Sequence, residues 1–366
     1  MNVLFTTNFP SPYRVDFFNE LGKYCNLTVA YERSRALHRD SKWVGNSAEN
    51  FKEIFLNQRP IGTSQSIGFG IIKTILKNKF DRIILCGYAS PSVILAVAFC
   101  RLFNIKYMLE FDGGFYKKDK FFLRNLKKFI FRGSDKLLIT CHDTERYLKS
   151  FGITPEKISF YPFSSLWKSE ILDEVVSDEE KQSLKNELGI SEKKAIISVG
   201  QFLYGKGFDI LIKAMQYVED SEVGVYIVGG EVTEEYLKLC KSCRIDNIHF
   251  VSFCKKDELL KWYKACDLFV FPTRSDVWGL VVNEAMACGL PVISSNMCIA
   301  AKELLNNSET FIYNCEDYKE LSCKINSVLK SDLKNFGTKS LDIIRDYTIE
   351  NMALEHLNIL QIPERD

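Results

Sequence analysis

The sequence predicts an α/β protein of two Rossmann-like domains, each a doubly wound parallel sheet covered by helices. Short runs rich in β-branched and aromatic residues alternate with helix-length stretches in the first half, and the alternation resumes from residue 194. The 366 residues are also too many for one ordinary core, so two domains are expected. With 46% hydrophobic and 26% charged residues, the chain has the composition of a folded globular protein.

The elements follow from the apolar runs and the Gly and Pro residues between them. Strands are expected at residues 3–7, 27–31, 82–86, 106–111 and 136–140, with helices at 13–23, 91–103 and 144–150. In the second half, strands are expected at 195–199, 223–228, 249–252, 268–271 and 291–294. We expect an N-terminal domain over 1–165, a linker with the first helix of the next domain over 166–193, and a C-terminal domain over 194–345. A C-terminal helix is expected over 346–366. It can dock on either domain, and we expect it to cross back to the first.

The charge distribution separates the two halves. Residues 1–165 carry 25 Lys and Arg against 14 Asp and Glu, a net charge of +11, and the remaining residues carry 23 against 33, a net charge of −10. The basic half is therefore expected to meet an anionic partner. The longest apolar run, residues 93–100, is too short to span a bilayer, and the start MNVLFTTNFP lacks a signal-peptide pattern. A cytoplasmic protein is expected.

The twelve cysteines fit thiols in a reducing cytoplasm. Cys240 and Cys243 are the one close pair, in a helical pattern with no second pair nearby. They are interpreted either as zinc ligands or as two ordinary helix cysteines.

The segment FPTRSDVWGLVVNEAMACGLPVI, residues 271–293, predicts a ligand site. A buried strand breaks at Pro272, a polar turn follows, and an apolar helix begins after Gly279. Asp276 therefore lies at the carboxyl end of a strand, where open α/β sheets bind ligands. Glu284 lies eight residues further on and can also accept hydrogen bonds from a polyhydroxylated ligand. From spacing alone, a capping Asp276 and a solvated Glu284 remain the alternative.

Backbone amides at the start of this helix are expected to bind an anion or sugar hydroxyls. They belong to Trp278, Gly279 and Leu280. The first amides of a helix have no acceptor within the helix, so they are free to meet a ligand.

The same segment resembles the acid-x7-acid signature of family 4 retaining glycosyltransferases, and GLVVNEAMACGLPVIS resembles the family's helix and following strand. This resemblance implies the GT-B fold, in which two Rossmann-like domains face each other across a cleft. It also implies that Asp276, where the family usually has Glu, contacts the donor sugar, and that Glu284 holds the ribose.

A second resemblance lies in SVGQFLYGKGFDILIKAM, residues 198–215, which is similar to the family's opening strand, loop and helix of the nucleotide domain. Lys206 can neutralise the leaving diphosphate there, although it can also be a solvated turn lysine. The family commonly has Arg after the first glycine, whereas Gln201 follows Gly200 here. Arg274 either supplies that charge or is an exposed loop arginine.

The amino-terminal half offers acceptor-side candidates. NFPSPYRVDFFNEL follows the first strand, without the glycine pair that many family members have, and leaves Asn8, Ser11 and Arg14 as the local polar side chains. Pro12 suits the first position of a helix, so Arg14 can equally be a structural helix-start residue.

The end of the strand at residues 106–111 offers further candidates. Asp112 and Gly113 follow it, and a glycine there lets backbone approach a ligand. Many family members have His near this position, whereas Glu110 and Asp112 stand here. Asp112 orients or deprotonates an acceptor hydroxyl, or it caps the turn. His142, after the next strand, is a further candidate, although a lone histidine is more often structural.

Residues 117–132 interleave basic and aromatic side chains. The basic residues are Lys117, Lys118, Lys120, Arg124, Lys127, Lys128 and Arg132, among Phe121, Phe122, Phe129 and Phe131. This pattern suits an anionic membrane surface at the inner face of the plasma membrane. The ordinary alternative is a helix packed by its aromatics with a solvated basic face. Nucleic acid is not expected, because no binding motif accompanies the basic residues.

The resemblance implies transfer of a hexose-type sugar, with retention, from a nucleotide diphosphate sugar, UDP favoured, to a glycan or polyprenyl-linked glycan hydroxyl in surface polysaccharide synthesis. No cofactor is expected, and the absence of a DxD motif gives no reason to expect a metal. The alternatives are a nucleotide-sugar epimerase of the same architecture and a catalytically weak nucleotide-sugar-binding paralogue that acts as a partner subunit.

Overall fold

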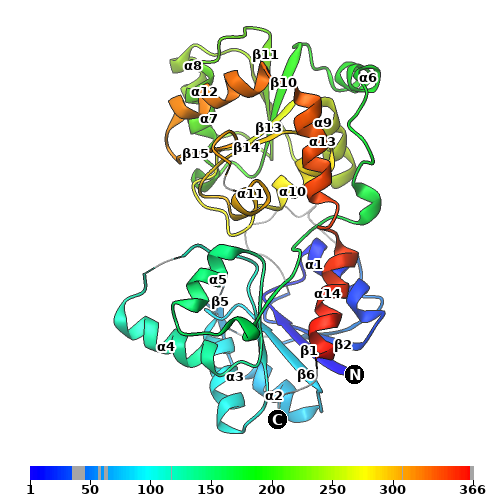
Figure 1. Ribbon diagram of the computed structural model, residues 1–366, viewed down its shortest axis with the longest axis vertical. Helices are drawn as coiled ribbons and strands as arrows, with labels where there is room; N and C mark the ends of the chain where they lie inside the picture. The colour runs from blue at the N-terminus through cyan, green and yellow to red at the C-terminus, as the bar shows by residue number, and fades with distance from the viewer. Residues whose placement is uncertain (35–45, 57–58, 62–64, 117, 307, 363–366) are drawn as a thin grey trace. The chain divides into compact units, whose positions relative to one another are not determined.

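Two parallel sheets, each covered by helices, organise the chain (Figure 1). The computed structural model describes residues 1–34, 46–56, 59–61, 65–116, 118–306 and 308–362. Unit 1 consists of Met1–Ser165 with Tyr347–Asp366, and unit 2 consists of Leu166–Asp346. The prediction of an α/β protein with two Rossmann-like sheets is confirmed.

The sheet of unit 1 has seven strands in the order β3-β2-β1-β6-β7-β8-β9, all parallel. They are β1 (Asn2–Thr7), β2 (Asn26–Tyr31), β3 (Lys52–Phe55), β6 (Arg82–Cys86), β7 (Met108–Glu110), β8 (Leu137–Ile139) and β9 (Ile158–Phe160). A hairpin of β4 (Arg59–Ile61) and β5 (Gln65–Ile67) lies outside this sheet. The sequence analysis missed β3 and β9, because these edge strands are short and half-exposed and lack the continuous apolar run of a central strand.

Helices cover this sheet and close its core. They are α1 (Pro12–Gly22), α2 (Gly70–Lys77), α3 (Pro91–Leu102), α4 (Phe121–Arg132), α5 (His142–Lys149) and α14 (Ile349–Gln361). The last of these starts where the hydroxyl of Thr348 accepts a hydrogen bond from the backbone N–H of Asn351, at 3.1 Å. It packs against α1, so the red end of the chain lies beside its blue beginning in Figure 1. The chain thus leaves unit 1 at Ser165 and returns to it at Tyr347.

The sheet of unit 2 has six parallel strands in the order β12-β11-β10-β13-β14-β15. They are β10 (Lys194–Val199), β11 (Val223–Val228), β12 (Ile248–Val251), β13 (Leu268–Phe271), β14 (Val292–Ser295) and β15 (Ile312–Tyr313). The helices are α6 (Asp178–Leu188), α7 (Phe208–Met215), α8 (Glu234–Cys243), α9 (Lys256–Ala265), α10 (Leu280–Ala287), α11 (Ile299–Leu304), α12 (Tyr318–Leu329) and α13 (Leu333–Ile344). Central strands β10, β11 and β13 are almost wholly buried, as expected for a sheet covered on both faces.

The acidic segment expected as a linker lies within unit 2. Its helix α6 begins where the hydroxyl of Ser177 accepts from the backbone N–H of Glu180, at 3.1 Å, and ends at Gly189 with φ 71°. Lys181 and Lys185 extend from this helix to the carboxylate of Asp267, at 2.9 and 2.8 Å. These ion pairs fix α6 to the start of β13.

Candidate functional site

The topology of each sheet marks one edge as the place for a ligand. In unit 2 the chain runs outward from β10 to β12 and then returns to build outward from β13 to β15. The strand order reverses between β10 and β13, and ligands of open α/β sheets bind outside the carboxyl ends of strands at such a reversal. The loops that follow these two strands contain Lys206 and Asp276. In unit 1 the corresponding reversal lies between β1 and β6.

The structure brings Lys206 and Asp276 together. The Lys206 ammonium lies 2.6 Å from Asp276 Oδ2, and the two side chains are 26% and 20% exposed. The ammonium also lies 5.2 Å from the centre of the Phe271 ring. Lys206 is therefore not a freely solvated turn lysine. Asp276 is not the helix cap either, because Gly279 occupies the N-cap position of α10.

Gly207 allows the two loops to approach. It has φ 70°, and a Cβ at this position would lie 2.0 Å from the carbonyl oxygen of Pro272. Only glycine fits such a conformation and such a space. Across the same contact, the carbonyl of Gly205 accepts from the Thr273 hydroxyl at 2.9 Å and from the Arg274 N–H at 2.7 Å. The Lys206 loop is thereby fixed to the end of β13.

Arg274 belongs to this support. Its guanidinium forms a two-pronged ion pair with Asp209, at 2.7 and 2.8 Å, and a second with Glu316. It also donates to the carbonyl of Tyr204 and lies 3.9 Å from the centre of that ring. The side chain is 11% exposed, so Arg274 is not the exposed loop arginine of the alternative interpretation.

The charge on Arg274 is paired with carboxylates of its own unit. The hydrogen bonds that its guanidinium donates to Asp209 and Glu316 raise its pKa, and burial acts against them. In turn the Arg274 guanidinium lowers the pKa of Asp209 despite the burial of that carboxyl. The guanidinium contacts Asp209, Glu316 and Tyr204, so it holds the loop. It does not supply the charge of the arginine that the family commonly has where Gln201 stands here.

The start of α10 presents backbone amides beside the Lys206–Asp276 pair. Gly279 adopts φ 103°, and a Cβ there would lie 2.7 Å from the sulfur of Cys298, so the helix begins where a side chain has no space. The first amides of α10, from Leu280 onward, point out of the helix end. The Trp278 indole is 3% exposed and donates to the Asn283 side chain at 3.0 Å, so this residue supports the turn.

Glu284 lies on the second turn of α10 and is half-buried. The hydroxyl of Tyr263, a fully buried residue of α9, donates to Glu284 Oε2 at 3.2 Å. Burial, with the neighbouring Glu284 carboxylate, raises the pKa of Tyr263 well above its ordinary value, so the phenol remains a donor. Sequence reasoning had missed Tyr263, which no local pattern connects with Glu284.

Gly200 and Gln201 end β10 at the same edge. The Gly200 N–H donates to the carbonyl of Val228, at 2.9 Å, and the Gln201 carbonyl accepts from the Leu203 N–H at 2.7 Å. Gln201 is half-buried. Both predicted residues thus lie at the start of the loop that leads to Lys206.

Unit 1 collects its predicted residues at the carboxyl edge of its own sheet. Asn8 follows β1, Asp112 and Gly113 follow β7, and His142 begins α5 after β8. Because neighbouring strands are parallel, their carboxyl ends meet at this edge. Asn8 lies near Gly87, which follows β6, and Gly113 has φ 134°.

Arg14 lies on the first turn of α1 and is buried. It is 1% exposed, donates to Glu110 Oε1 at 2.7 Å and also donates to Asp112 Oδ1. Ser11 caps the helix through its backbone, whose carbonyl accepts from the N–H groups of Arg14 and Val15. Arg14 therefore links two acidic side chains rather than standing free at the edge.

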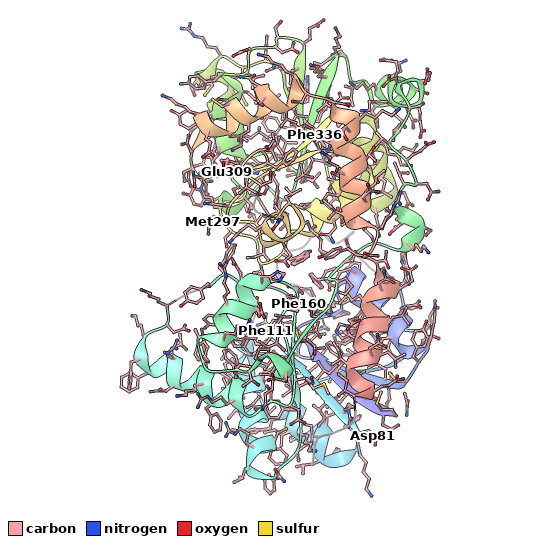
Figure 2. The ribbon with its side chains drawn as sticks, in the orientation of Figure 1. Asp81, Phe111, Phe160, Met297, Glu309 and Phe336 are labelled. Carbon is pink, nitrogen blue, oxygen red and sulfur yellow. The ribbon has the colours of Figure 1, made fainter. Side chains whose placement is uncertain are left out.

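Asp112 keeps part of its surface at this edge. Its side chain is 34% exposed, and burial of the rest, with the nearby Glu110 carboxylate, raises its pKa although Arg14 opposes the change. Its carboxylate accepts from Arg14 and, at 3.4 Å, from the hydroxyl of Tyr161. His142 is exposed, and its ring lies 5.0 Å from that of Phe160, which Figure 2 labels.

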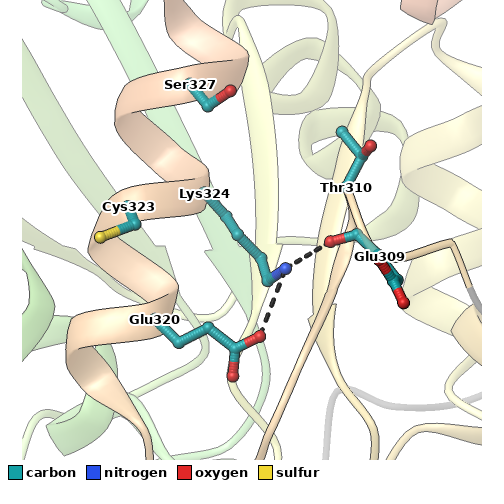
Figure 3. Close-up of a pocket in the computed structure, with 6 residues that line it drawn as sticks. All are labelled: Glu309, Thr310, Glu320, Cys323, Lys324 and Ser327. Atoms are coloured by element: carbon teal, nitrogen blue, oxygen red, sulfur yellow. Dashed lines mark hydrogen bonds and ion pairs between the residues drawn. The ribbon is translucent and has the colours of Figure 1, made fainter.

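Two other features of unit 2 do not extend the site. A cavity of about 270 Å³ lies between α12 and residues 309–310 (Figure 3). Lys324 lines this cavity. Its ammonium donates a hydrogen bond to the Glu309 carbonyl and forms an ion pair with Glu320 at 3.3 Å. Cys240 and Cys243 are free thiols of α8, and the described residues bring no third metal-binding side chain to them.

The aromatics of α4 do not pack inward as a group. Phe121 and Phe122 are 73% and 87% exposed, whereas Ile130 and Phe131 are the buried residues of this helix. Lys117 lies outside the described residues. No helix in the described ranges is both long and apolar enough to cross a membrane.

Comparison with known proteins identifies the class of enzyme. Residues 180–347 match the family model described as glycosyl transferases group 1. The structure of HepE from Anabaena in complex with UDP superimposes with a TM-score of 0.77 over 98% of this chain and 99% of that one, at 14% identity. The fold is therefore GT-B, the chain is a glycosyltransferase, and its residues 180–347 are similar to the group 1 family.

Two curated relatives extend the comparison. An uncharacterized 41.2 kDa protein in the cps region of Klebsiella pneumoniae is 24% identical over 300 residues, 79% of each chain. N,N'-diacetylbacillosaminyl-diphospho-undecaprenol alpha-1,3-N-acetylgalactosaminyltransferase of Campylobacter jejuni is 20% identical over 274 residues, 72% of each chain. The glycosyltransferase likeness thus extends beyond the group 1 domain.

Proposed function

We propose that this enzyme is a retaining, family 4 type glycosyltransferase that moves a hexose-type sugar from a UDP-sugar to a hydroxyl of a glycan or polyprenyl-linked glycan. The observation that carries the proposal is the Lys206–Asp276 pair, held at 2.6 Å beside the start of α10 at the strand-order reversal of unit 2. The pair places a cation and an acid where a diphosphate sugar would bring both charge and hydroxyls.

Breaking the bond between the sugar and the diphosphate leaves negative charge on the leaving oxygen. An ammonium has three N–H donors, and Asp276 takes one, so Lys206 has donors for that oxygen. The amides at the start of α10 add partial positive charge on the same side. In this proposal Asp276 accepts from the donor-sugar hydroxyls, and Glu284, steadied by Tyr263, accepts from the ribose.

The acceptor hydroxyl would bind at the carboxyl edge of the sheet in unit 1. Asp112 is the partly exposed acid there, and burial raises its pKa toward neutral pH. Its carboxylate can accept a hydrogen bond from the acceptor hydroxyl and so orient it. Asn8 and His142 would contact other acceptor groups. For retention, the donor phosphate receives the acceptor proton on the face that the diphosphate leaves.

Names of relatives support the substrate class. The HepE structure holds UDP, the Campylobacter relative is named for a diphospho-undecaprenol substrate, and the Klebsiella relative is named for a cps region. We therefore propose a role in surface polysaccharide assembly, at the inner face of the plasma membrane and without cofactor or metal.

The test is incubation of the purified enzyme with UDP- and GDP-sugars and a polyprenyl-diphosphate-linked glycan, with and without EDTA. We expect UDP release coupled to transfer, an unchanged anomeric configuration by NMR, and no loss in EDTA. Glu284→Ala should raise the KM for the donor, whereas Glu234→Ala, an 84% exposed acid of α8, should not. Epimerised donor without acceptor, or nucleotide binding without turnover, would support the rival functions instead.

We also propose that α4 contacts an anionic membrane surface. Its outward side chains are large and apolar, with the exposed Lys120 and Lys128 beside them. The apolar residues are Phe121, Phe122, Leu123, Leu126 and Phe129, here called the α4 patch. The inner face of the helix is fixed, because Lys127 donates to Asp119 and Tyr147, both at 2.7 Å. A helix with exposed phenylalanines and flanking cations suits the headgroup region.

Vesicle sedimentation tests this surface. Wild type should bind vesicles containing phosphatidylglycerol more tightly than phosphatidylcholine vesicles, and added salt should weaken binding. Phe121→Ser combined with Phe122→Ser should reduce the affinity at least about tenfold, because the membrane contact loses the two aromatic side chains that it would bury. Leu237→Ser, on an exposed leucine of unit 2, is the control. Equal binding to both vesicle types, or by the double variant, would contradict the proposal.

A further inference from the structure

A buried histidine of the C-terminal helix lies behind the acceptor edge of unit 1. His356 of α14 is fully buried, and its Nδ1 lies 2.8 Å from the carbonyl oxygen of Met352. A carbonyl only accepts hydrogen bonds, so this nitrogen carries a hydrogen. The tautomer of a neutral ring would then leave Nε2 as an acceptor.

Nε2 faces another acceptor. It lies 3.7 Å from Glu110 Oε2, and neither atom has a hydrogen-bond partner among the described residues. The rings of Phe5, Phe17 and Tyr161 surround the imidazole, with centroids at 6.3, 4.7 and 4.7 Å. Two lone pairs facing each other in a buried site would repel, so a proton lies between the ring and the carboxyl group.

That proton belongs on the imidazole. Glu110 Oε1 already accepts from Arg14 at 2.7 Å and from the Tyr161 hydroxyl at 3.0 Å, and both contacts favour the carboxylate. The guanidinium of Arg14 and the contact with His356 lower the pKa of Glu110 to about 2, against the effect of burial.

The charges of the cluster balance only with this second cation. Arg14 alone faces two carboxylates, Glu110 and Asp112, so the cluster would otherwise hold a net negative charge in a buried site. An imidazolium at position 356 makes the cluster neutral. Buried charges are stable when they are paired in this way, and removal of one partner is strongly unfavourable.

We propose that His356 is a positioning residue for the acceptor side: its imidazolium holds Glu110, Glu110 holds Arg14, and Arg14 holds Asp112 ionised at the edge of the sheet. The proposal rests on the function proposed above, in which Asp112 meets the acceptor. In this proposal, the acceptor edge of unit 1 can orient an acceptor hydroxyl only when α14 is docked.

The first experiment observes the proton directly in the intact chain. Histidine ¹⁵N–¹H correlation NMR resolves the four imidazoles, and His356→Gln identifies the signal of His356. We expect both ring nitrogens of His356 to carry hydrogen at pH 8, where exposed histidines are neutral. A neutral ring at pH 8 would overturn the proposal, whatever reaction the enzyme catalyses.

The second experiment uses activity. His356→Leu should lower kcat at least about tenfold, with the donor KM unchanged. Without the imidazolium, Asp112 is no longer held ionised and orients the acceptor hydroxyl less well. Loss of a nearby cation raises a carboxyl pKa, so the acidic limb of the kcat/KM profile should move to higher pH. Adding Glu110→Gln, which removes the unpaired carboxylate, should restore most of the activity and move the limb back.

The matched control is His249→Leu. His249 also pairs with a glutamate, Glu192 at 2.6 Å, but it lies in unit 2 and is 40% exposed. It should leave kcat and the pH profile unchanged. If wild type transfers sugar and His356→Leu keeps both its rate and its acidic limb, the positioning role is wrong. If wild type transfers none, the proposed function fails, and the NMR result still decides the state of His356.

Discussion

Lys206→Ala is expected to lower kcat about 10²–10³-fold, the loss typical of removing one group that stabilises charge in a transition state. The ammonium lies at the strand-order reversal, 2.6 Å from Asp276, where the leaving diphosphate is proposed to sit. The effect on binding of UDP alone should be smaller, because charge on the leaving oxygen is fully developed only as the bond breaks.

Steady-state UDP release and calorimetric UDP binding separate these two effects. Lys238→Ala, on a 76% exposed lysine of the same unit, should match wild type in both. Lys206→Arg should retain part of the rate, since it keeps the cation but changes its shape. A wild-type kcat in Lys206→Ala would remove Lys206 from the mechanism.

Gly207→Ala should both destabilise unit 2 and reduce transfer. The left-handed backbone conformation costs an alanine about 1–2 kcal/mol. The added Cβ would lie 2.0 Å from the Pro272 carbonyl oxygen, so the loop must also move away from β13. We expect a total destabilisation of about 2–4 kcal/mol and a loss of the Lys206–Asp276 pair.

The neighbouring glycine provides the control. At Gly205 an added Cβ would have no described heavy atom within 4 Å, so Gly205→Ala should leave urea unfolding and transfer close to wild type. If the two variants behave alike, close approach at Gly207 does not position the site.

Much of the fold could be predicted because the central strands are continuous apolar runs bounded by Gly or Pro. The strands at residues 82–86, 223–228 and 268–271 have the expected limits. Edge strands β3, β9 and β15 were missed, since a short strand with one covered side has no such run. Lys206 and Asp276 could be found from local motifs, because glycines and strand ends determine where a loop presents its side chains.

Partners that come from distant segments could not be predicted. The ion pairs of Arg274 reach Asp209 and Glu316, 65 and 42 residues away, and nothing near Arg274 in the sequence indicates them. The same holds for Arg14 and Glu110, 96 residues apart. One local feature did indicate such a partner. Glu110 is an acidic residue at the end of a buried strand, and a buried carboxylate requires a buried partner.

The division of unit 1 into two stretches of chain affects the order in which the protein can fold during synthesis. Unit 2 is continuous, so all of its strands and helices have been made once residue 346 has left the ribosome. Residues 1–165 are made first, yet the face of α1 that packs against α14 must wait for the last helix to emerge. Domains generally fold as units in the order of synthesis. Here the segment translated first is therefore completed last, and a nascent chain completes unit 2 before unit 1.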